Sequence, residues 1–142
     1  MTNESLLALL NECDVAAGKV LIPDKAYHCF QMFQEPDSSC ITQSSVYEVI
    51  VLIHCRSKAG IILRYGNFDV HWIIKEEYRG KHILSRFLRT GWLNLIWPDN
   101  IEVTISDAVD SREEYLQKCY LAELAGLQIR DKDRLDKFIL GK

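Results

Sequence analysis

The sequence lacks most of the features that assign a protein to a class at first sight. Lysine and arginine number 17 against 20 aspartates and glutamates, so the formal net charge is −3. Broad nucleic-acid binding needs a basic face that neutralises phosphates, and we therefore expect no nucleic-acid partner. The N-terminus carries no basic segment, and no apolar run approaches the roughly 18 residues of a membrane helix. We predict neither a signal peptide nor membrane association.

Cysteine is present in an odd number and in no metal-binding pattern. No Cys-x-x-Cys pair occurs, and the four histidines have no metal-ligand spacing among themselves or with the cysteines. We therefore expect no disulfide framework and no metal. Reduced, mostly buried thiols in a cytoplasmic protein are the simplest interpretation, and a thiol-based sensor is the alternative. The five cysteines are Cys13, Cys29, Cys40, Cys55 and Cys119.

What the chain does have is the length and composition of one globular domain. It has 142 residues, of which 48% are hydrophobic and 26% charged. This is enough for a real core and too little for two ordinary domains. We predict a single domain over residues 1–142.

The N-terminal third contains one clear element. A helix is expected from Asn3, with an apolar side at positions 6, 7, 9 and 10, and it ends before Gly18. Residues 23–33 fit a helix and a strand equally well. Residues 35–45 are polar and rich in serine, which predicts a surface loop.

Three strands follow, at 46–55, 61–65 and 68–75. The polar residues 56–60 suit a turn, and Gly66-Asn67 is typical of a two-residue hairpin. The three strands should form an antiparallel meander.

The second half alternates helices and strands. An amphipathic helix is expected from Lys81 to the stop at Pro98, followed by a strand at 101–105. Ser111 opens a second helix that ends near Ala125 at a left-handed Gly126. Strands at 127–130 and 135–140 come last, with a short final helix as the alternative. The order predicts an α/β (α+β) fold: a mixed, mostly antiparallel sheet with one central parallel strand pair and helices on both faces.

The chain is organised around the joint between the strand at 68–75 and the helix at 81. A short polar turn, Lys75 to Gly80, leads into the helix. The first amide groups of a helix have no intrahelical partner, and the helix dipole adds positive character. The joint is therefore a candidate anion site.

The joint also carries a family resemblance. The run Glu77-Tyr78-Arg79-Gly80-Lys81-His82-Ile83-Leu84, in this order of elements, resembles the central motif of the GCN5-related N-acetyltransferases (GNAT). That motif is Gln or Arg, two residues, Gly, one residue, then Gly or Ala. Arg79 matches its first position, whereas His82 and Leu84 stand where the small residues belong. Residues 120–127 resemble a second family segment more weakly, and the likeness covers roughly residues 46–130.

The resemblance implies an acyltransferase with acetyl-CoA as co-substrate. The backbone at Ile74 would bind the pantetheine arm, and an amine of a small molecule or a peptide would attack the thioester directly. The amide groups that would hold the pyrophosphate are those of Arg79, Gly80, Lys81, His82, Ile83, Leu84 and Ser85. Glycine at positions 82 and 84 would let phosphate approach the backbone, so His82 and Leu84 could narrow this cradle. His82 could instead donate a hydrogen bond to phosphate, and Leu84 could point into the core as part of the apolar stripe of the helix.

The resemblance also implies a tyrosine as the acid that protonates the leaving thiolate. The family position falls on Ala122, which leaves Tyr115 and Tyr120 on the same helix as candidates. Candidates for the base are Glu48, Asp69, His71, Glu76 and Glu77.

The absence of glycine at positions 82 and 84 leaves a second class of function possible. The chain could be a non-catalytic domain of the same fold that binds a protein or a small ligand. Trp92 and Trp97 are open as core residues or as part of a homodimer interface.

Overall fold

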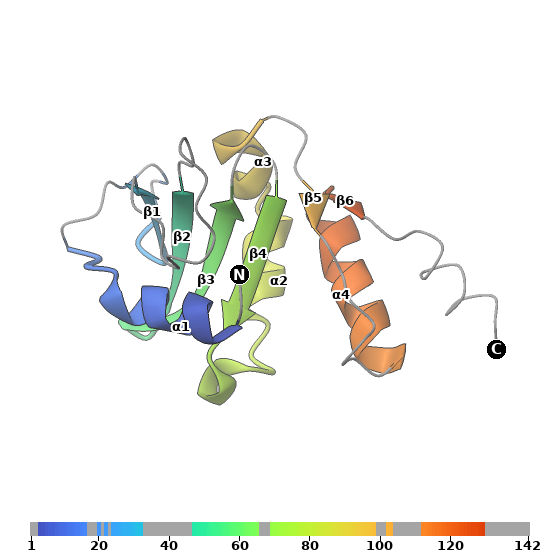
Figure 1. Ribbon diagram of the computed structural model, residues 1–142, viewed down its shortest axis with the longest axis horizontal. Coiled ribbons are helices and arrows are strands. Elements are labelled where there is room, and N and C mark those ends of the chain that lie inside the picture. Colours follow the sequence, from blue (N-terminus) through green and yellow to red (C-terminus); the bar gives the residue numbers. More distant parts are fainter. Residues whose placement is uncertain are drawn as a thin grey trace.

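A computed structural model of the chain shows a mixed α and β architecture built on a six-stranded sheet (Figure 1). The strands lie in the sheet in sequence order, from β1 to β6. The residues that the structure describes are 3–16, 20, 22, 24–32, 47–65, 69–98, 102–103 and 112–129. The predicted loop at 35–45 lies outside these residues.

Four antiparallel strands form most of the sheet. They are β1 (Tyr27–Met32), β2 (Tyr47–His54), β3 (Ser57–Tyr65) and β4 (Asp69–Ile74). The predicted meander of three strands is confirmed. The ambiguous segment at 23–33 forms the strand β1, which extends the meander by pairing with β2 along its whole length.

The turns between these strands differ from the prediction. The turn expected over 56–60 is wrong: His54 pairs with Ser57, so Cys55 and Arg56 alone make the turn, with φ of 50° and 68°. Two residues at positive φ give the twist that a tight hairpin needs, even though neither is glycine. Tyr65 pairs with Asp69, so three residues connect β3 to β4 rather than the two expected.

Two short strands complete the sheet. β5 (Glu102–Val103) pairs with β4 in parallel at Asp69, and β6 (Gln128–Ile129) pairs in parallel with β5. The strand predicted at 135–140 lies outside the described residues.

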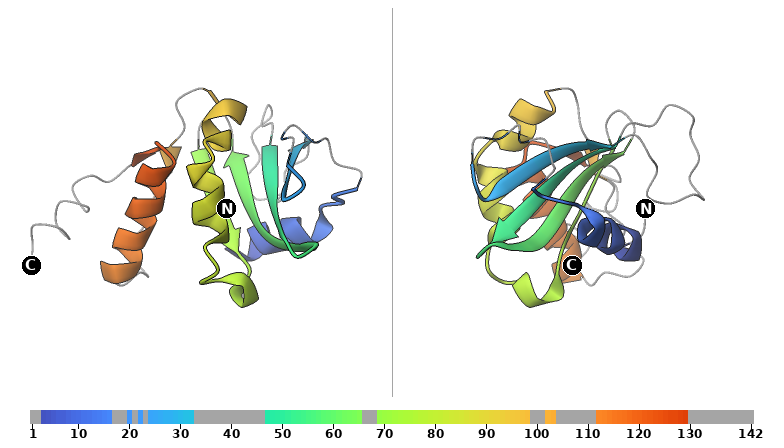
Figure 2. Two further views of the ribbon diagram at one scale, coloured as in Figure 1. Left: turned by 180° about the vertical axis from the view of Figure 1, so that it is seen from behind. Right: turned by 90° about the vertical axis from the view of Figure 1, so that its left-hand side faces the viewer.

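Helices cover both faces of the sheet, as the two views of Figure 2 show. α1 (Asn3–Glu12) lies on one face, where its buried leucines share a core cluster with residues of β2, β3 and β4. α2 (Ile83–Arg89), α3 (Trp92–Ile96) and α4 (Arg112–Leu124) pack on the other face. Trp97 is 1% exposed in this second core, which makes it a core residue and not an interface residue.

The single helix expected from Lys81 to Pro98 is wrong. It begins at Ile83 and breaks at Gly91, which has φ of 78°. The Thr90 hydroxyl donates to Phe87 O and accepts the amide of Trp92, so it satisfies backbone groups on both sides of the break. Gly91 is a weak helix former, and the Thr90 hydroxyl competes for backbone hydrogen bonds. Together they end α2 and start α3.

The end of α4 is as predicted. Gly126 has φ of 72°, its amide donates to Glu123 O at 3.0 Å, and the amide of Leu127 donates to Ala122 O at 2.9 Å. These bonds form a Schellman motif, in which glycine avoids the cost of left-handed backbone. Within the described part of the chain, no helix is long and apolar enough to cross a membrane.

Candidate functional site

A groove of about 840 Å³ opens beside the C-terminal end of β4. One wall is the end of β4 with the turn and the first residues of α2, and the opposite wall is α4; Asn3 of α1 also lines the groove. The residues that line the two walls are Trp72, Ile73, Ile74, Tyr78, Arg79, Gly80, His82, Ile83, Leu84 and Ser85 on the first, and Glu113, Gln117, Lys118 and Leu121 on the second.

The groove brings together most of the residues predicted to bind a cofactor. Seven of the eight line it: Ile74, Arg79, Gly80, His82, Ile83, Leu84 and Ser85. Lys81 is exposed and is not part of the lining. Its carbonyl instead accepts a hydrogen bond from Arg86 Nη2 at 2.9 Å, which helps to hold the turn.

The turn is tied to the strand that precedes it. The amide of Lys75 donates to Ala59 O at 2.8 Å, the last backbone bond from this strand to β3, and a 3₁₀ turn, η1 (Glu76–Tyr78), follows. Arg79 Nε donates to Ile74 O at 3.1 Å. Because Nε makes this bond, the turn is held without the two terminal nitrogens of the guanidinium.

His82 holds a backbone conformation that L side chains rarely adopt. It is the N-cap of α2, with φ of 58° and ψ of 25°, and its side chain makes no capping hydrogen bond. Its carbonyl accepts the amide of Arg86 at 3.0 Å and Ser85 Oγ at 3.2 Å. Left-handed backbone costs a residue with a Cβ about 1–2 kcal/mol, which gives a physical reason for glycine at this motif position.

Leu84 behaves differently from His82. Its side chain is only 7% exposed and belongs to the core beneath α2, beside Phe87. This burial favours a core position for Leu84, which also contributes to the lining of the groove. His82, which is exposed, is the one departure from the motif that faces solvent.

Of the two tyrosines predicted to act as the acid, the one with a described side chain, Tyr120, does not line the groove. Tyr120 is 45% exposed, and its hydroxyl accepts a hydrogen bond from Arg89 Nη2 at 3.1 Å, outside the groove lining. Tyr115 belongs to α4, but its side chain lies outside the described part of the structure.

The four candidate bases with described side chains do not line the groove. Glu48 accepts a hydrogen bond from Trp97 Nε1 and lies 3.5 Å from Arg64, near the start of β2 and far from the Ile74 end of β4. Glu76 and Glu77 are exposed in η1, and His71 is not part of the groove lining. The side chain of Asp69 is not described.

Several lining residues were missed in the sequence. The sequence indicates Tyr78 only as motif context; in the structure its ring packs against His54, with ring centroids 5.9 Å apart. Glu113, Gln117 and Leu121 have the four-residue spacing of one helix face, a signal that marks a face but not what it faces. That this face turns toward β4 depends on the packing of α4, which no local pattern encodes.

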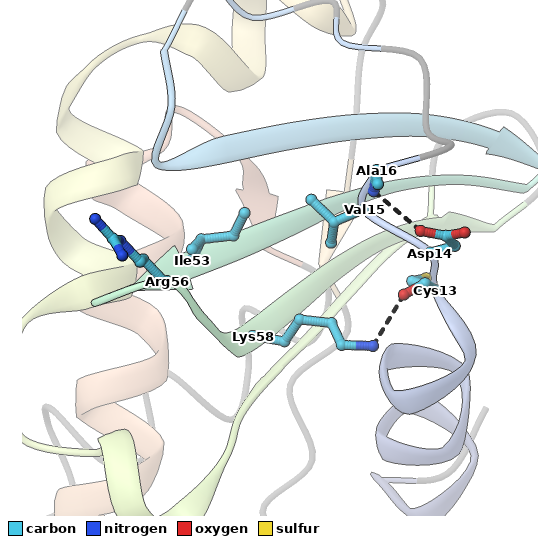
Figure 3. A pocket seen from close by; sticks show the side chains of 7 residues that line it. All are labelled: Cys13, Asp14, Val15, Ala16, Ile53, Arg56 and Lys58. Atoms are coloured by element: carbon cyan, nitrogen blue, oxygen red, sulfur yellow. Dashed lines mark hydrogen bonds between the residues drawn. The ribbon is translucent and has the colours of Figure 1, made fainter.

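A second cavity, of about 300 Å³, lies at the C-terminal end of α1 (Figure 3). Lys58 Nζ reaches across from β3 and donates to Asn11 O at 3.0 Å and to Cys13 O at 2.9 Å. A lysine that binds the last carbonyls of a helix satisfies backbone acceptors and complements the dipole. We interpret this cluster as the support of α1 and not as a ligand site.

No family model, curated protein or solved structure matches this chain. Function must therefore be inferred from the groove itself and from the motif that lines it.

Proposed function

We propose that this protein is an N-acyltransferase that binds an acyl-CoA, such as acetyl-CoA, in the groove beside β4. One observation carries the proposal. The turn whose sequence resembles the acetyl-CoA motif of the GNAT family lines a single groove together with the end of β4 and one face of α4. A binding site of this kind is expected at the carboxyl end of a strand in an open α/β sheet.

The sheet itself supports a GNAT-like fold. β5 pairs with β4 only at Asp69, at the start of β4, among the residues that the structure describes. The groove opens beside Trp72 to Ile74, further along the same strand. Two parallel strands that part beyond this pairing would admit an extended arm between them.

The residues of the turn suit a pyrophosphate. Amide groups from Gly80 to Ser85 would donate to phosphate oxygens, and the Arg79 guanidinium would add positive charge. Gly80 has φ of 80°, and a Cβ built on it would meet no atom within 4 Å, so this part of the turn is open. The backbone at Ile74 would bind the amides of the pantetheine arm, and the acceptor would be an amine of a small molecule or a peptide.

A second candidate function is ligand binding without catalysis. Two observations favour it: His82 replaces a motif glycine, and Tyr120 bonds to Arg89 rather than reaching the groove. Direct transfer to an amine needs a base and an acid near the thioester. Tyr115 stays a candidate acid under the first proposal.

An acyl-transfer assay separates the two functions. Wild-type protein is incubated with acetyl-CoA and a panel of small and peptide amines, and release of the CoA thiol is followed. Transfer above the uncatalysed rate, with a KM for acetyl-CoA that rises about tenfold or more in Arg79→Ala, would support catalysis, since a hydrogen bond to a charged group contributes about 1.5–3 kcal/mol. Arg56→Ala, an exposed arginine at the β2–β3 turn, is the matched control and should leave KM unchanged. CoA binding without transfer to any amine would favour the second candidate.

A further inference from the structure

The groove has two chemically different ends. Arg79 and His82 belong to the turn that forms one end, and Glu113 lies in the first turn of α4, which begins at Arg112. Trp72 and Leu121 lie at the other end. α4 runs antiparallel to β4 (Figure 1). The N-terminal half of the helix therefore stands beside the turn, and its C-terminal half stands beside the strand.

The apolar end is held in place by the core. Trp72 is partly buried and lies opposite Ile62 in the register of β3 and β4. Both Trp72 and Leu121 pack against the core cluster that includes Phe87. Side chains anchored in this way cannot move aside without disturbing a packed interior.

We propose that Trp72 and Leu121 close the apolar end of the groove and restrict the acyl donor to short acyl groups. The inference rests on the proposed acyl-CoA site. With the anionic part of the donor at the turn, the thioester end points along β4 toward Trp72. An acetyl group fits against the indole and Leu121, whereas a longer chain meets an indole anchored in the core. Its extra methylenes then stay in water.

The test is a calorimetric titration with free CoA, acetyl-CoA, butyryl-CoA and hexanoyl-CoA. Wild-type protein should bind acetyl-CoA at least as tightly as the longer donors. Trp72→Phe and Leu121→Ala should shift the preference toward butyryl-CoA, by about fourfold for each methylene that the enlarged end buries, since burial of a methylene is worth about 0.8 kcal/mol. Trp72→Ala should extend the shift to hexanoyl-CoA.

The controls separate this inference from the proposed function. Trp92→Phe removes the same atoms from a partly buried tryptophan of α3 outside the groove, and it should keep the wild-type order of affinities. Thermal unfolding of each variant shows whether it is folded, and Trp72→Phe and Leu121→Ala decide the outcome if Trp72→Ala is not. Variants that bind CoA but keep the wild-type chain-length order would overturn the inference while leaving the CoA site standing. Failure of wild-type protein to bind free CoA would overturn the proposed function and the inference with it.

Discussion

At the scale of single residues, His82 is the position where this chain departs most from the motif that it resembles. Its φ of 58° predicts that His82→Gly stabilises the fold. Glycine relieves about 1–2 kcal/mol of left-handed strain but restores about 0.4–1 kcal/mol of unfolded-state freedom. We expect a net gain of about 0.5–1 kcal/mol, seen as a rise of about 2–3 °C in Tm by calorimetry.

Arg56 supplies a matched control, because it has φ of 68° in the β2–β3 turn and is exposed. Arg56→Gly should raise Tm by a similar amount. Only His82→Gly should also tighten CoA binding, since removal of the Cβ lets phosphate approach the amides. Equal CoA affinity in wild-type protein and His82→Gly would show that the His82 side chain does not narrow the site.

The cysteines can be separated by exposure and pKa. Burial raises the pKa of the Cys13 thiol, partly offset by the nearby Lys58 ammonium, whereas Cys55 is exposed at the β2–β3 turn. A raised pKa leaves less thiolate at a given pH, and thiolate is the reactive form. With a limiting alkylating reagent near pH 7.5, peptide mapping should find Cys55 modified before Cys13, Cys29 and Cys119, the other cysteines that the structure describes. Preferential labelling of Cys13 would instead favour a thiol-based sensor.

The sequence could distinguish some residues of the site but not others. Arg79 and Gly80 were identified by motif position alone, and they line the groove. His82 and Leu84 both replace small motif residues, but only Leu84 belongs to the apolar stripe of the helix, which allows it a core position. Its burial in the structure agrees with that alternative, whereas His82 is exposed.

At the scale of elements, Gly60 connects the fold to the groove. A Cβ built on Gly60 would lie 2.8 Å from Ile73 O and even closer to Ile74 Cδ1, at the part of β4 that lines the groove. Backbone at Ile73 must shift to admit a methyl group, so Gly60→Ala should destabilise the fold by about 1–3 kcal/mol. Urea unfolding measures this, with Ser57→Ala, at an exposed position of the same strand, as the control. A loss no larger than that of Ser57→Ala would show that the β3–β4 approach is not tight.

Gly60 also shows why one element was mispredicted. In the sequence, a glycine after Arg-Ser-Lys-Ala indicates a turn. In the structure it is a strand residue that allows close approach of β4, and the turn belongs to Cys55 and Arg56. By contrast, β2 and the Gly126 end of α4 were predicted well because their signals are local: a β-branched run and a left-handed glycine.

At the scale of the whole molecule, the position of α4 beside β4 could not be predicted from the sequence. The groove exists because α4 returns beside β4 after the two-residue strand β5. Nothing in residues 112–124 indicates which strand their face will meet, and the polar members Glu113, Gln117 and Lys118 read as a solvated surface. Half of the candidate site was therefore predictable from one motif, and the other half needed the three-dimensional path of the chain.

One measurement tests the acyl-CoA site most directly: a calorimetric titration of CoA into wild-type protein, Leu121→Trp and Leu95→Trp. Leu121 lines the groove, whereas Leu95 is 71% exposed on α3, outside the groove, and the same substitution there serves as the control. We predict one CoA site in wild-type protein and in Leu95→Trp, and at least a tenfold loss of affinity in Leu121→Trp, whose larger side chain fills the groove. Absence of binding to wild-type protein at millimolar CoA, or equal affinity in all three proteins, would contradict the proposal that this groove is an acyl-CoA site.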